Sequence, residues 1–227
     1  MTLLEVEDVR RTFGGIVALD GVTFDVTAGE THVVMGANGA GKTTLFNCIT
    51  GYYRPDSGTV RYRGEDITGM RADRTARLGI RRTFQEVDVF DELTVAENIS
   101  LASFETQPRE IMARLDLIEI HDKYGDELTL FERKRVALAL VTDGDLLLLD
   151  EVFSGVNPSE KPAMLGYLEE LARDHTLVLI EHDIETAFEL ADRMVVLDQG
   201  RVLAHGSPGE IRTDETVQEQ YLGEMAI

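Results

Sequence analysis

The 227-residue sequence is poor in cysteine and in positive charge, and it has no long apolar segment. A single cysteine, Cys48, excludes an internal disulfide and a thiol-ligated metal cluster. The longest apolar runs, such as Val136–Val141 and Leu146–Leu149, are far too short to cross a bilayer. The N-terminal stretch MTLLEVEDVRR carries acidic residues inside its one apolar segment and lacks a small-residue cleavage site, so it is not a secretory signal. We therefore expect a soluble, intracellular protein.

Positive charge is scarce, because 22 Lys and Arg residues face 42 Asp and Glu residues and the formal net charge is −20. A surface of this charge repels polyanions, which argues against binding of DNA, RNA or anionic lipid headgroups. An acidic, lysine-poor composition resembles that of proteins from salt-loving organisms, and an acidic protein of an ordinary cytoplasm is the alternative. The few lysines are Lys42, Lys123, Lys134 and Lys161.

The most informative feature that is present is the stretch GANGAGKTT, Gly36–Thr44, which fits the phosphate-binding pattern G-x-x-x-x-G-K-[ST]. It lies between an apolar run and a predicted helix over Lys42–Ile49, which is the context that the pattern requires. Its glycines allow backbone angles that side chains forbid, so successive N–H groups turn inward and line a concavity for phosphate oxygens. The motif predicts binding of ATP or GTP; a glycine-rich turn before a helix is the alternative.

The residues after the glycines complete the predicted site. Lys42 adds a charge that reaches the outer phosphates, and the Thr43 hydroxyl is placed to bind a Mg²⁺ ion that bridges them. The N-terminus of the predicted helix directs its positive dipole end at the same anion. We therefore predict Mg²⁺ and a nucleoside triphosphate as cofactors, with the nucleotide held by Gly36, Asn38, Gly39, Ala40, Gly41, Lys42, Thr43 and Thr44; the choice of ATP over GTP is implied only by the family resemblance given below.

Short apolar or alternating segments predict β-strands along most of the chain. Helical patterns lie between several of them, including Lys161–Arg173 and Ile184–Asp192, and this alternation implies an α/β protein with a mainly parallel sheet. Capping-box spacing marks helix starts at Thr94 and Ser207. The predicted strands are Leu3–Val9, Val22–Val26, His32–Met35, Val60–Tyr62, Leu146–Asp150, Leu177–Glu181, Met194–Leu197 and Val202–His205.

The alternation of strands and helices is interrupted between about residues 86 and 141, where helical patterns occur without strands. We interpret this segment as an inserted helical lobe. The chain 1–227 is then a single domain, with a nucleotide-binding core formed by residues 1–85 and 142–227 and a lobe formed by residues 86–141.

Two carboxylates follow the apolar run Leu146–Leu149. Parallel sheets place their ligands at the carboxyl ends of the strands, so Asp150 and Glu151 are predicted to lie at the nucleotide. Asp150 can orient the metal shell, directly or through water. Glu151, one residue farther out, can polarise a water molecule for in-line attack on the terminal phosphate. A strand that merely ends in an acidic turn is the alternative.

Two further candidates lie at a strand end and at the core–lobe junction. His182 follows the predicted strand Leu177–Glu181, a position that would bring it near the same phosphates, although a lone histidine is more often a surface turn residue. Gln85 lies between the nucleotide core and the lobe, where its amide could bind the metal and report phosphate occupancy to the lobe. For Gln85 a solvated turn residue is the alternative.

Taken together, these motifs resemble the ATP-binding-cassette (ABC) ATPases, the motor subunits of ABC transporters, over nearly the whole chain from residue 4 to 223. The resemblance implies a P-loop ABC ATPase core with a mainly parallel sheet, an antiparallel β subdomain and an inserted helical lobe. It also implies that Gln85 is the lobe switch, Glu151 the general base and His182 the clasp of the terminal phosphate. The adenine-stacking aromatic of the family falls at Phe13, for which a core aromatic is the alternative.

Within the family, the chain is similar to the ATPases of importers for branched-chain amino acids and related polar solutes. The similarity is carried by RRTFQEVDVFDELTVAENI (81–99), SGVNP (154–158), LIEHDIE (179–185) and QYLGE (220–224). The resemblance implies a dimer that binds integral membrane permease subunits at the cytoplasmic face of the cell membrane, as a peripheral protein. An extracytoplasmic solute-binding protein would supply the solute, ATP would close the dimer and hydrolysis would reset it.

The signature of the family, usually Leu-Ser-Gly-Gly-Gln or Leu-Ser-Tyr-Gly-Gln, is altered to LTLFE at Leu128–Glu132. Thr129 can still cap a helix, but Phe131 replaces a glycine whose bare backbone lets a phosphate approach, and Glu132 replaces a neutral amide. In the family each signature closes over the ATP of the opposite subunit. We therefore predict two weakened sites in a homodimer, and an active site on this chain when the second ABC ATPase subunit has an intact signature.

The leading prediction is an ATP-binding and ATP-hydrolysing subunit that energises a membrane solute importer. An ATP-binding regulatory subunit with little turnover is the alternative, which the altered signature favours and the intact Glu151 and His182 oppose. A soluble ABC protein of DNA repair or translation is disfavoured, because the sequence has no second cassette, coiled coil, zinc-ligand cysteines or basic face.

Overall fold

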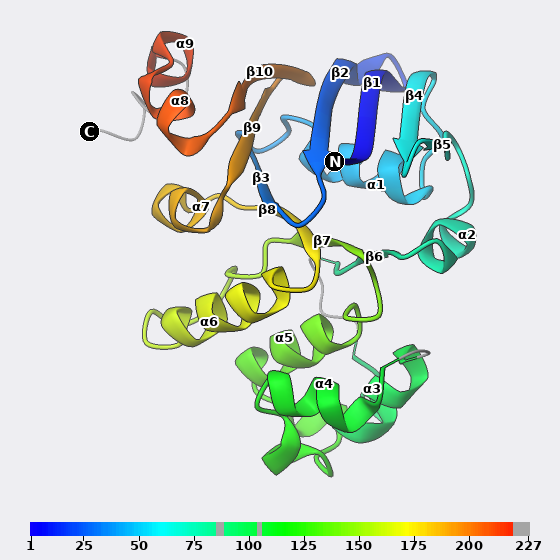
Figure 1. Cartoon of the computed structure of the whole chain (residues 1–227), viewed down its shortest axis with the longest axis vertical. Helices are drawn as coiled ribbons and strands as arrows, with labels where there is room; N and C mark the ends of the chain where they lie inside the picture. Colours follow the sequence, from blue (N-terminus) through cyan, green and yellow to red (C-terminus); the bar gives the residue numbers. More distant parts are fainter. Residues whose placement is uncertain (85–88, 104–105, 220–227) are drawn as a thin grey trace.

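A six-stranded sheet forms the centre of the molecule (Figure 1). The computed structural model describes residues 1–84, 89–103 and 106–219. The strand order is β10-β9-β3-β8-β7-β6, and neighbouring strands are parallel except β10, which runs antiparallel to β9. The strands are β3 (Thr31–Met35), β6 (Ile80–Arg82), β7 (Leu146–Asp150), β8 (Thr176–Ile180), β9 (Arg193–Asp198) and β10 (Arg201–Gly206).

Both faces of the inner strands are covered, which explains why these strands are continuous apolar runs. Every residue of β3, β7 and β8 is buried. Side chains alternate between the two faces of a strand, so Leu147 and Leu149 enter one hydrophobic core while Leu146 and Leu148 enter the other. The sheet is therefore a layer between two cores, and its polar groups are concentrated at the strand ends.

An antiparallel sheet of order β2-β1-β4-β5 forms a second layer. The helix α1 (Lys42–Thr50) contributes Leu45, Phe46 and Ile49 to the core that this sheet shares with the central sheet. Figure 1 shows α1 beside the antiparallel strands. The strands are β1 (Thr2–Phe13), β2 (Ile16–Thr27), β4 (Ser57–Tyr62) and β5 (Glu65–Asp66).

The described residues between β6 and β7 form helices, which lie at the lower end of the molecule in Figure 1. They are α3 (Val95–Ala102), α4 (Pro108–Arg114) and α5 (Leu130–Ala139), with 3₁₀ turns at Ile118–Ile120 and Gly125–Glu127. The capping box predicted at Thr94 is present, because the Thr94 hydroxyl accepts a hydrogen bond from the N–H of Glu97 and the Glu97 carboxylate accepts one from the N–H of Thr94. Such a box satisfies N–H groups that the helix itself cannot pair.

The other helices are α2 (Ala72–Arg77), α6 (Lys161–Ala172), α7 (Ile184–Leu190), α8 (Pro208–Thr213) and α9 (Glu215–Val217). α8 begins with the second predicted capping box, at Ser207 and Glu210. None of the helices in the described part of the chain combines the length and the apolar character that a membrane span requires.

The predicted α/β fold is confirmed, with its mainly parallel sheet, antiparallel β subdomain and helical insertion. Each predicted strand is present, but β5 and β6 were missed. The β6 strand lacks an apolar run because Arg81 and Arg82 follow Ile80, and it exists because its backbone pairs with β7. The exact division into a core of residues 1–85 and 142–227 and a lobe of residues 86–141 stays a prediction.

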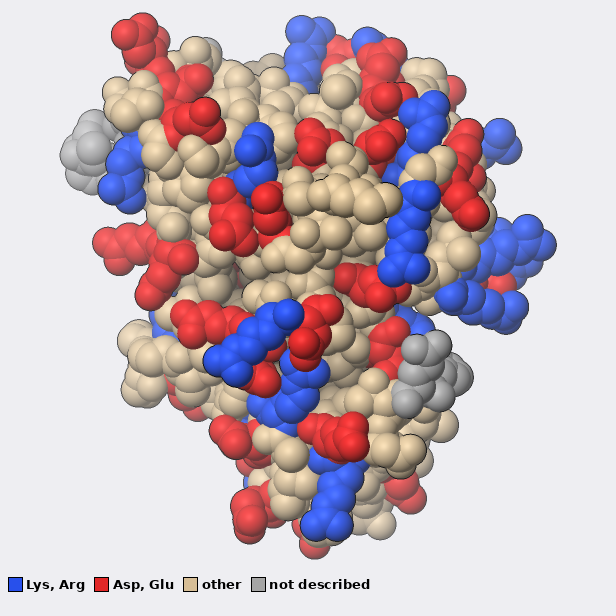
Figure 2. Space-filling model, in the orientation of Figure 1, with Lys and Arg blue, Asp and Glu red and all other residues tan. Residues whose placement is uncertain are grey.

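The surface reflects the acidic composition. On the face drawn in Figure 2, Asp and Glu side chains are spread over the whole height of the molecule and are interleaved with Lys and Arg. Many of the arginines form ion pairs, such as Arg61 with Glu7 at 2.6 Å and Arg133 with Asp91 at 2.6 Å. Exposed pairs of this kind contribute little stability and are weakened further by salt.

Candidate functional site

The glycine-rich loop connects β3 to α1 and has the backbone that a phosphate cradle requires. Gly36, Gly39 and Gly41 have φ angles of 151°, 82° and 107°. A Cβ atom at Gly36 would lie 2.3 Å from the carbonyl oxygen of Leu197, and one at Gly41 would lie 2.5 Å from that of Ala18. Both contacts are far inside van der Waals distance, so side chains are excluded at these two positions by their neighbours as well as by their backbone angles.

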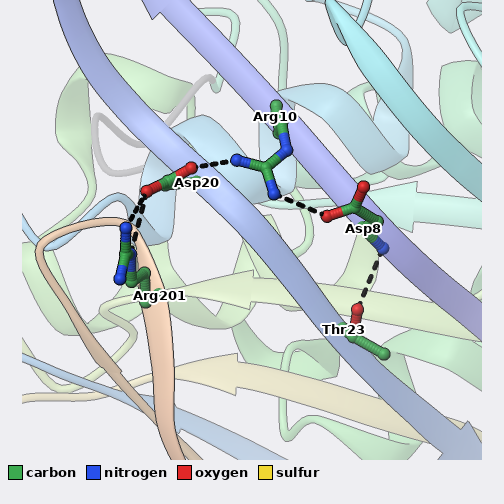
Figure 3. A network of polar contacts seen from close by, with 5 residues as sticks. All are labelled: Asp8, Arg10, Asp20, Thr23 and Arg201. Carbon is green, nitrogen blue, oxygen red and sulfur yellow. Dashed lines mark hydrogen bonds and ion pairs between the residues drawn. The ribbon is translucent and has the colours of Figure 1, made fainter.

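Hydrogen bonds anchor this loop to both sheets. The N–H of Gly200, in the turn between β9 and β10, donates to the Ala40 carbonyl oxygen at 3.0 Å, and the N–H of Asp20 donates to the Gly200 carbonyl oxygen at 2.8 Å. Arg201 donates from Nε to Asp20 Oδ2 at 2.8 Å, and Arg10 bonds the other oxygen of the same carboxylate (Figure 3). These contacts hold the pKa of Asp20 below its ordinary value, and the hydrogen bond from Arg201 is the largest cause.

The network in Figure 3 therefore connects β1, β2 and the first residue of β10. Asp8 is its outer member and accepts from Arg10 Nη2 at 2.9 Å. The turn that bonds the loop at Ala40 is thus itself held by β2, which favours a preorganised loop, and preorganised donors bind anions with a lower cost of ordering.

Lys42 is buried in the concavity of the loop. Its Nζ donates to the carbonyl oxygens of Gly36 at 2.7 Å and Ala37 at 3.0 Å. Burial lowers the pKa of Lys42, and the carboxylates of Glu151 and Asp150 act in the opposite direction. Both carboxylates thus act on the charge of Lys42, and the roles of the three residues at a bound nucleotide stay predictions.

The first turn of α1 is open to an anion. Gly41 is its N-cap, no side chain caps it, and its first turn has no acidic residue. Thr43 is exposed and Thr44 is partly buried in this turn, while Asn38 is exposed in the loop before it. Ala40 is buried beneath the loop. Unpaired N–H groups and the helix dipole make such an end a binding site for phosphate.

The carboxylates of Asp150, the last residue of β7, and Glu151, which follows it, lie at the carboxyl end of that strand. Asp150 is 3% exposed, and its Oδ2 accepts a hydrogen bond from Arg82 Nη2 at 2.9 Å. Burial raises the pKa of Asp150, and the hydrogen bond and charge of Arg82 oppose that rise. Glu151 has a left-handed backbone with φ of 49°, which turns the chain out of the strand direction.

His182 and Glu151 are in direct contact. Because β7 and β8 are parallel with Asp150 opposite Ile180, the residues that follow the two strands leave the sheet side by side. His182 Nε2 lies 2.6 Å from Glu151 Oε1, and the side chains are 38% and 18% exposed. His182 therefore lies beside a strand-end carboxylate, and its predicted position near the phosphates of a nucleotide stays a prediction.

Phe13 lies at the end of β1 and is packed on two sides. Its ring meets the edge of Tyr53 with centroids 5.1 Å apart, and the guanidinium of Arg11 lies 4.6 Å from its centroid. The ring is partly buried, so it is neither a core aromatic nor fully open. Its role in stacking on adenine stays a prediction. Gln85, the predicted lobe switch and metal ligand, lies outside the described residues.

Comparison with known proteins identifies the family. A sequence profile of the ABC transporter family matches residues 19–154, a range that includes the loop, Asp150 and Glu151. The chain belongs to the ABC transporter family. A second profile, that of the branched-chain amino acid ATP-binding cassette transporters, matches residues 201–227. The predicted family is thereby confirmed, and with it the class of enzyme, a transport-coupled ATPase.

Individual relatives match this cassette over nearly its full length. It is 35% identical to BraF of Pseudomonas aeruginosa and to LivG of Escherichia coli strain K12, over 98% of this chain and 98% of each relative, and both are named high-affinity branched-chain amino acid transport ATP-binding proteins. A nucleotide-free ATP-binding cassette from an ABC transporter superposes with a TM-score of 0.87 at 28% identity, over 97% of this chain and 99% of that one. An ABC transporter cassette in its ADP conformation gives a TM-score of 0.85 at 28% identity, over 98% and 99%.

Sequence analysis missed three buried charged residues of the cassette, Arg82, Lys134 and Glu181. Lys134, on α5, is 6% exposed and donates from Nζ to the carbonyl oxygen of Glu151 at 3.2 Å. Glu181, which follows β8, is 3% exposed, and burial raises its pKa to about 8. A signal was available for Lys134, because it stands four residues before the buried Leu138 and so shares its helix face.

The altered signature forms a capping box at the N-terminus of α5. The Thr129 hydroxyl accepts from the N–H of Glu132 at 3.2 Å, and Glu132 Oε2 accepts from the N–H of Thr129 at 2.8 Å. The other oxygen of Glu132 accepts from Lys123 Nζ at 2.7 Å. Phe131 packs beside Tyr167, with ring centroids 6.4 Å apart. The Glu132 carboxylate thus accepts from the N–H of Thr129, the residue that caps the start of α5.

Proposed function

We propose that the chain is the ATP-hydrolysing subunit of an importer for branched-chain amino acids or related polar solutes. The single observation that carries hydrolysis is the 2.6 Å contact between Glu151 and His182 at the strand ends beside Lys42. A carboxylate next to a histidine at the mouth of a phosphate cradle is an arrangement for water activation and phosphate recognition. The solute class is supported by the printed names of the relatives BraF and LivG.

The residues fit a bound Mg²⁺ ion, which prefers hard oxygen ligands and commonly takes few of them from protein when phosphates supply the rest. The Thr43 hydroxyl on the first turn of α1 and the Asp150 carboxylate at the end of β7 are ligands of this kind. Gln85 would complete the set, as proposed from the sequence. When bound, Mg²⁺ would neutralise the negative charge of the phosphates.

The residues of the chain then have separate roles in phosphate binding and in water activation. Lys42 and the N–H groups of the loop hold the outer phosphates, and the dipole of α1 favours their charge. Glu151 accepts a proton from the attacking water, because its left-handed backbone turns the carboxylate out of the strand. His182 contacts the terminal phosphate and keeps the Glu151 carboxylate oriented toward it.

We propose that the cassette works at the cytoplasmic face of the membrane with permease subunits, and indirectly with an extracytoplasmic solute-binding protein. A groove of about 490 Å³ lies where α1, α2, β6 and α5 meet, and it is lined by Tyr52, Thr75, Phe84 and Leu140 among others. Tyr52 is 54% exposed and meets the edge of Phe84 at 5.4 Å between centroids. Nearby on the chain, Phe90 is 58% exposed, which supports a permease contact at this edge of the helical lobe.

We further propose that the second ATPase subunit is a different cassette with an intact signature. Glu132 places a carboxylate at the helix start that would face a partner's terminal phosphate, and Thr129 is already engaged in capping. Like charges repel, so this signature opposes nucleotide closure. The same observation favours the second candidate function, an ATP-binding regulatory subunit with little turnover.

The test measures ATP binding and hydrolysis with Mg²⁺ at high salt over a range of protein concentrations, for the wild type, Glu151→Gln and the exposed control Glu189→Gln. We expect tight ATP binding in all three proteins. Hydrolysis is expected on addition of a cassette with an intact signature, and Glu151→Gln should lower that rate by about 100-fold or more while Glu189→Gln leaves it unchanged. Brisk hydrolysis by the chain alone would contradict the heterodimer, and binding without turnover even with a partner would favour the regulatory subunit.

A further inference from the structure

Arg82 is a buried cation that the proposed hydrolysis does not use. Its side chain is 5% exposed, and the guanidinium spans two polar partners. Nη2 donates to Asp150 Oδ2 at 2.9 Å, and Nη1 donates to Asn47 Oδ1 at 2.5 Å. Its Cζ atom lies 5.4 Å from the ring centroid of Phe46 and 5.1 Å from that of Phe84. A planar guanidinium that lies within cation–π distance of two rings and is bonded through both Nη atoms has little freedom to move.

The partners of Arg82 belong to the elements that carry the proposed metal ligands. Asn47 stands one helical turn after Thr43 on α1. Asp150 is itself the proposed ligand at the end of β7. Arg82 ends β6 and is followed three residues later by Gln85. One side chain of β6 therefore connects α1 and β7, the two elements that carry the proposed ligands Thr43 and Asp150.

The neighbouring residue Thr83 strengthens this connection. Its N–H donates to the Leu148 carbonyl oxygen at 3.0 Å, and its hydroxyl accepts from the N–H of Asp150 at 3.1 Å. The backbone of Asp150 is thus held by Thr83 and its carboxylate by Arg82. Both contacts come from β6, so the position of the carboxylate is tied to the segment that leads to Gln85.

We propose that Arg82 is a positioning residue for magnesium: it fixes the orientation of the Asp150 carboxylate and keeps it in register with the first turn of α1. This inference rests on the proposed function, because it requires a Mg²⁺-dependent nucleotide site. With Oδ2 bonded to the guanidinium, the other oxygen of the carboxylate would be the one that binds the metal, directly or through water. Without Arg82, Asp150 loses its buried cationic partner and is free to turn toward Lys42, which would disturb the phosphate contact as well.

The experiment compares ATP binding by calorimetry in Mg²⁺ and in EDTA, so that the metal-dependent part of the affinity is isolated. Mn²⁺ binding to the ATP complex, followed by electron paramagnetic resonance, gives a second measure that does not involve turnover. The variants are Arg82→Met, Arg82→Lys and Asn47→Ala. Arg81→Met is the matched control, since Arg81 lies on the same strand with its side chain against Gly144. Thermal unfolding checks that each variant folds.

We expect Arg82→Met to weaken Mn²⁺ binding and the Mg²⁺-dependent gain in ATP affinity by about 10-fold or more, while affinity in EDTA changes less than about twofold. Arg82→Lys should show a similar loss, because an ammonium cannot span both partners in one plane. Asn47→Ala, which leaves Asp150 and its partner in place, should give a smaller loss in the same direction, and Arg81→Met none.

Several results would overturn the inference. If the Mg²⁺-dependent gain in ATP affinity were unchanged in Arg82→Lys and Asn47→Ala, the inference would be overturned even if Arg82→Met failed to fold. Equal losses in Mg²⁺ and in EDTA would show a merely structural role. In both cases Mg²⁺-dependent ATP binding by the wild type would leave the proposed function standing, whereas a wild type that binds no ATP would overturn the function and the inference together.

Discussion

The buried carboxyl group of Glu181 makes a quantitative prediction about stability. Glu181 is 3% exposed, and its Oε1 has no hydrogen-bond partner in the structure. Burial raises the pKa of Glu181 from 4.5 to about 8, while a backbone hydrogen bond from Phe153 and the charge of Lys134 oppose the rise. A carboxyl group with this pKa is mostly protonated in the folded protein at pH 7, although it is ionised in the unfolded chain.

The sign of the effect follows from the proton balance. Below pH 4.5 both states hold the proton, and Glu181 makes no pH-dependent contribution. Between pH 4.5 and about 8 the folded state keeps a proton that the unfolded state has lost, so stability falls as the pH rises. Each unit of pKa difference between the two states is worth about 1.4 kcal/mol. The rise in the pKa of Glu181 from 4.5 to about 8 therefore corresponds to a total loss of about 5 kcal/mol in the free energy of unfolding.

Glu181→Gln removes this loss because the amide keeps the shape and does not ionise. The free energy of unfolding should be measured by urea titration at pH 5, 6.5 and 8. Far-UV circular dichroism suits the chain, which has no tryptophan. The advantage of Glu181→Gln over the wild type is expected to grow by several kcal/mol from pH 5 to pH 8, and the exposed control Glu185→Gln should show no such trend. Parallel pH profiles for Glu181→Gln and the wild type would refute the reasoning.

Three further predictions test other parts of the molecule. Gly41→Ala should destabilise the fold by about 1–3 kcal/mol and weaken ATP binding, because its Cβ would lie 2.5 Å from the Ala18 carbonyl oxygen at a φ of 107°; urea unfolding and calorimetry measure the two effects. His32 is fully buried with a pKa lowered by burial to about 4, so stability should be lost as the pH falls from 6.5 toward 4, by about 3 kcal/mol, and His32→Gln should flatten that acid limb. Phe131→Gly combined with Glu132→Gln should raise ATP hydrolysis by the chain alone, and an unchanged rate would remove the signature as the cause of weak homodimer activity.

Much of the fold was predictable because its signals are local. The apolar runs of β3, β7 and β8 are continuous because both faces of these strands are covered, and the run itself shows this in the sequence. The capping boxes at Thr94 and Ser207 were visible because a cap and its partner are only three residues apart. The β6 strand was not predicted, because its existence depends on pairing with β7 rather than on its own composition.

The sequence alone determined the phosphate loop and the identity of the two strand-end carboxylates. Loop geometry depends on backbone freedom at glycine, which is a property of single residues, and the acidic pair directly follows its strand. Only the tertiary structure decided which charged side chains lie beside the two carboxylates. Arg82 meets Asp150 across 68 positions and Lys134 meets Glu151 across 17. Burial and charge pairing at such separations are set by how the sheets and helices pack, so no local pattern in the chain records them.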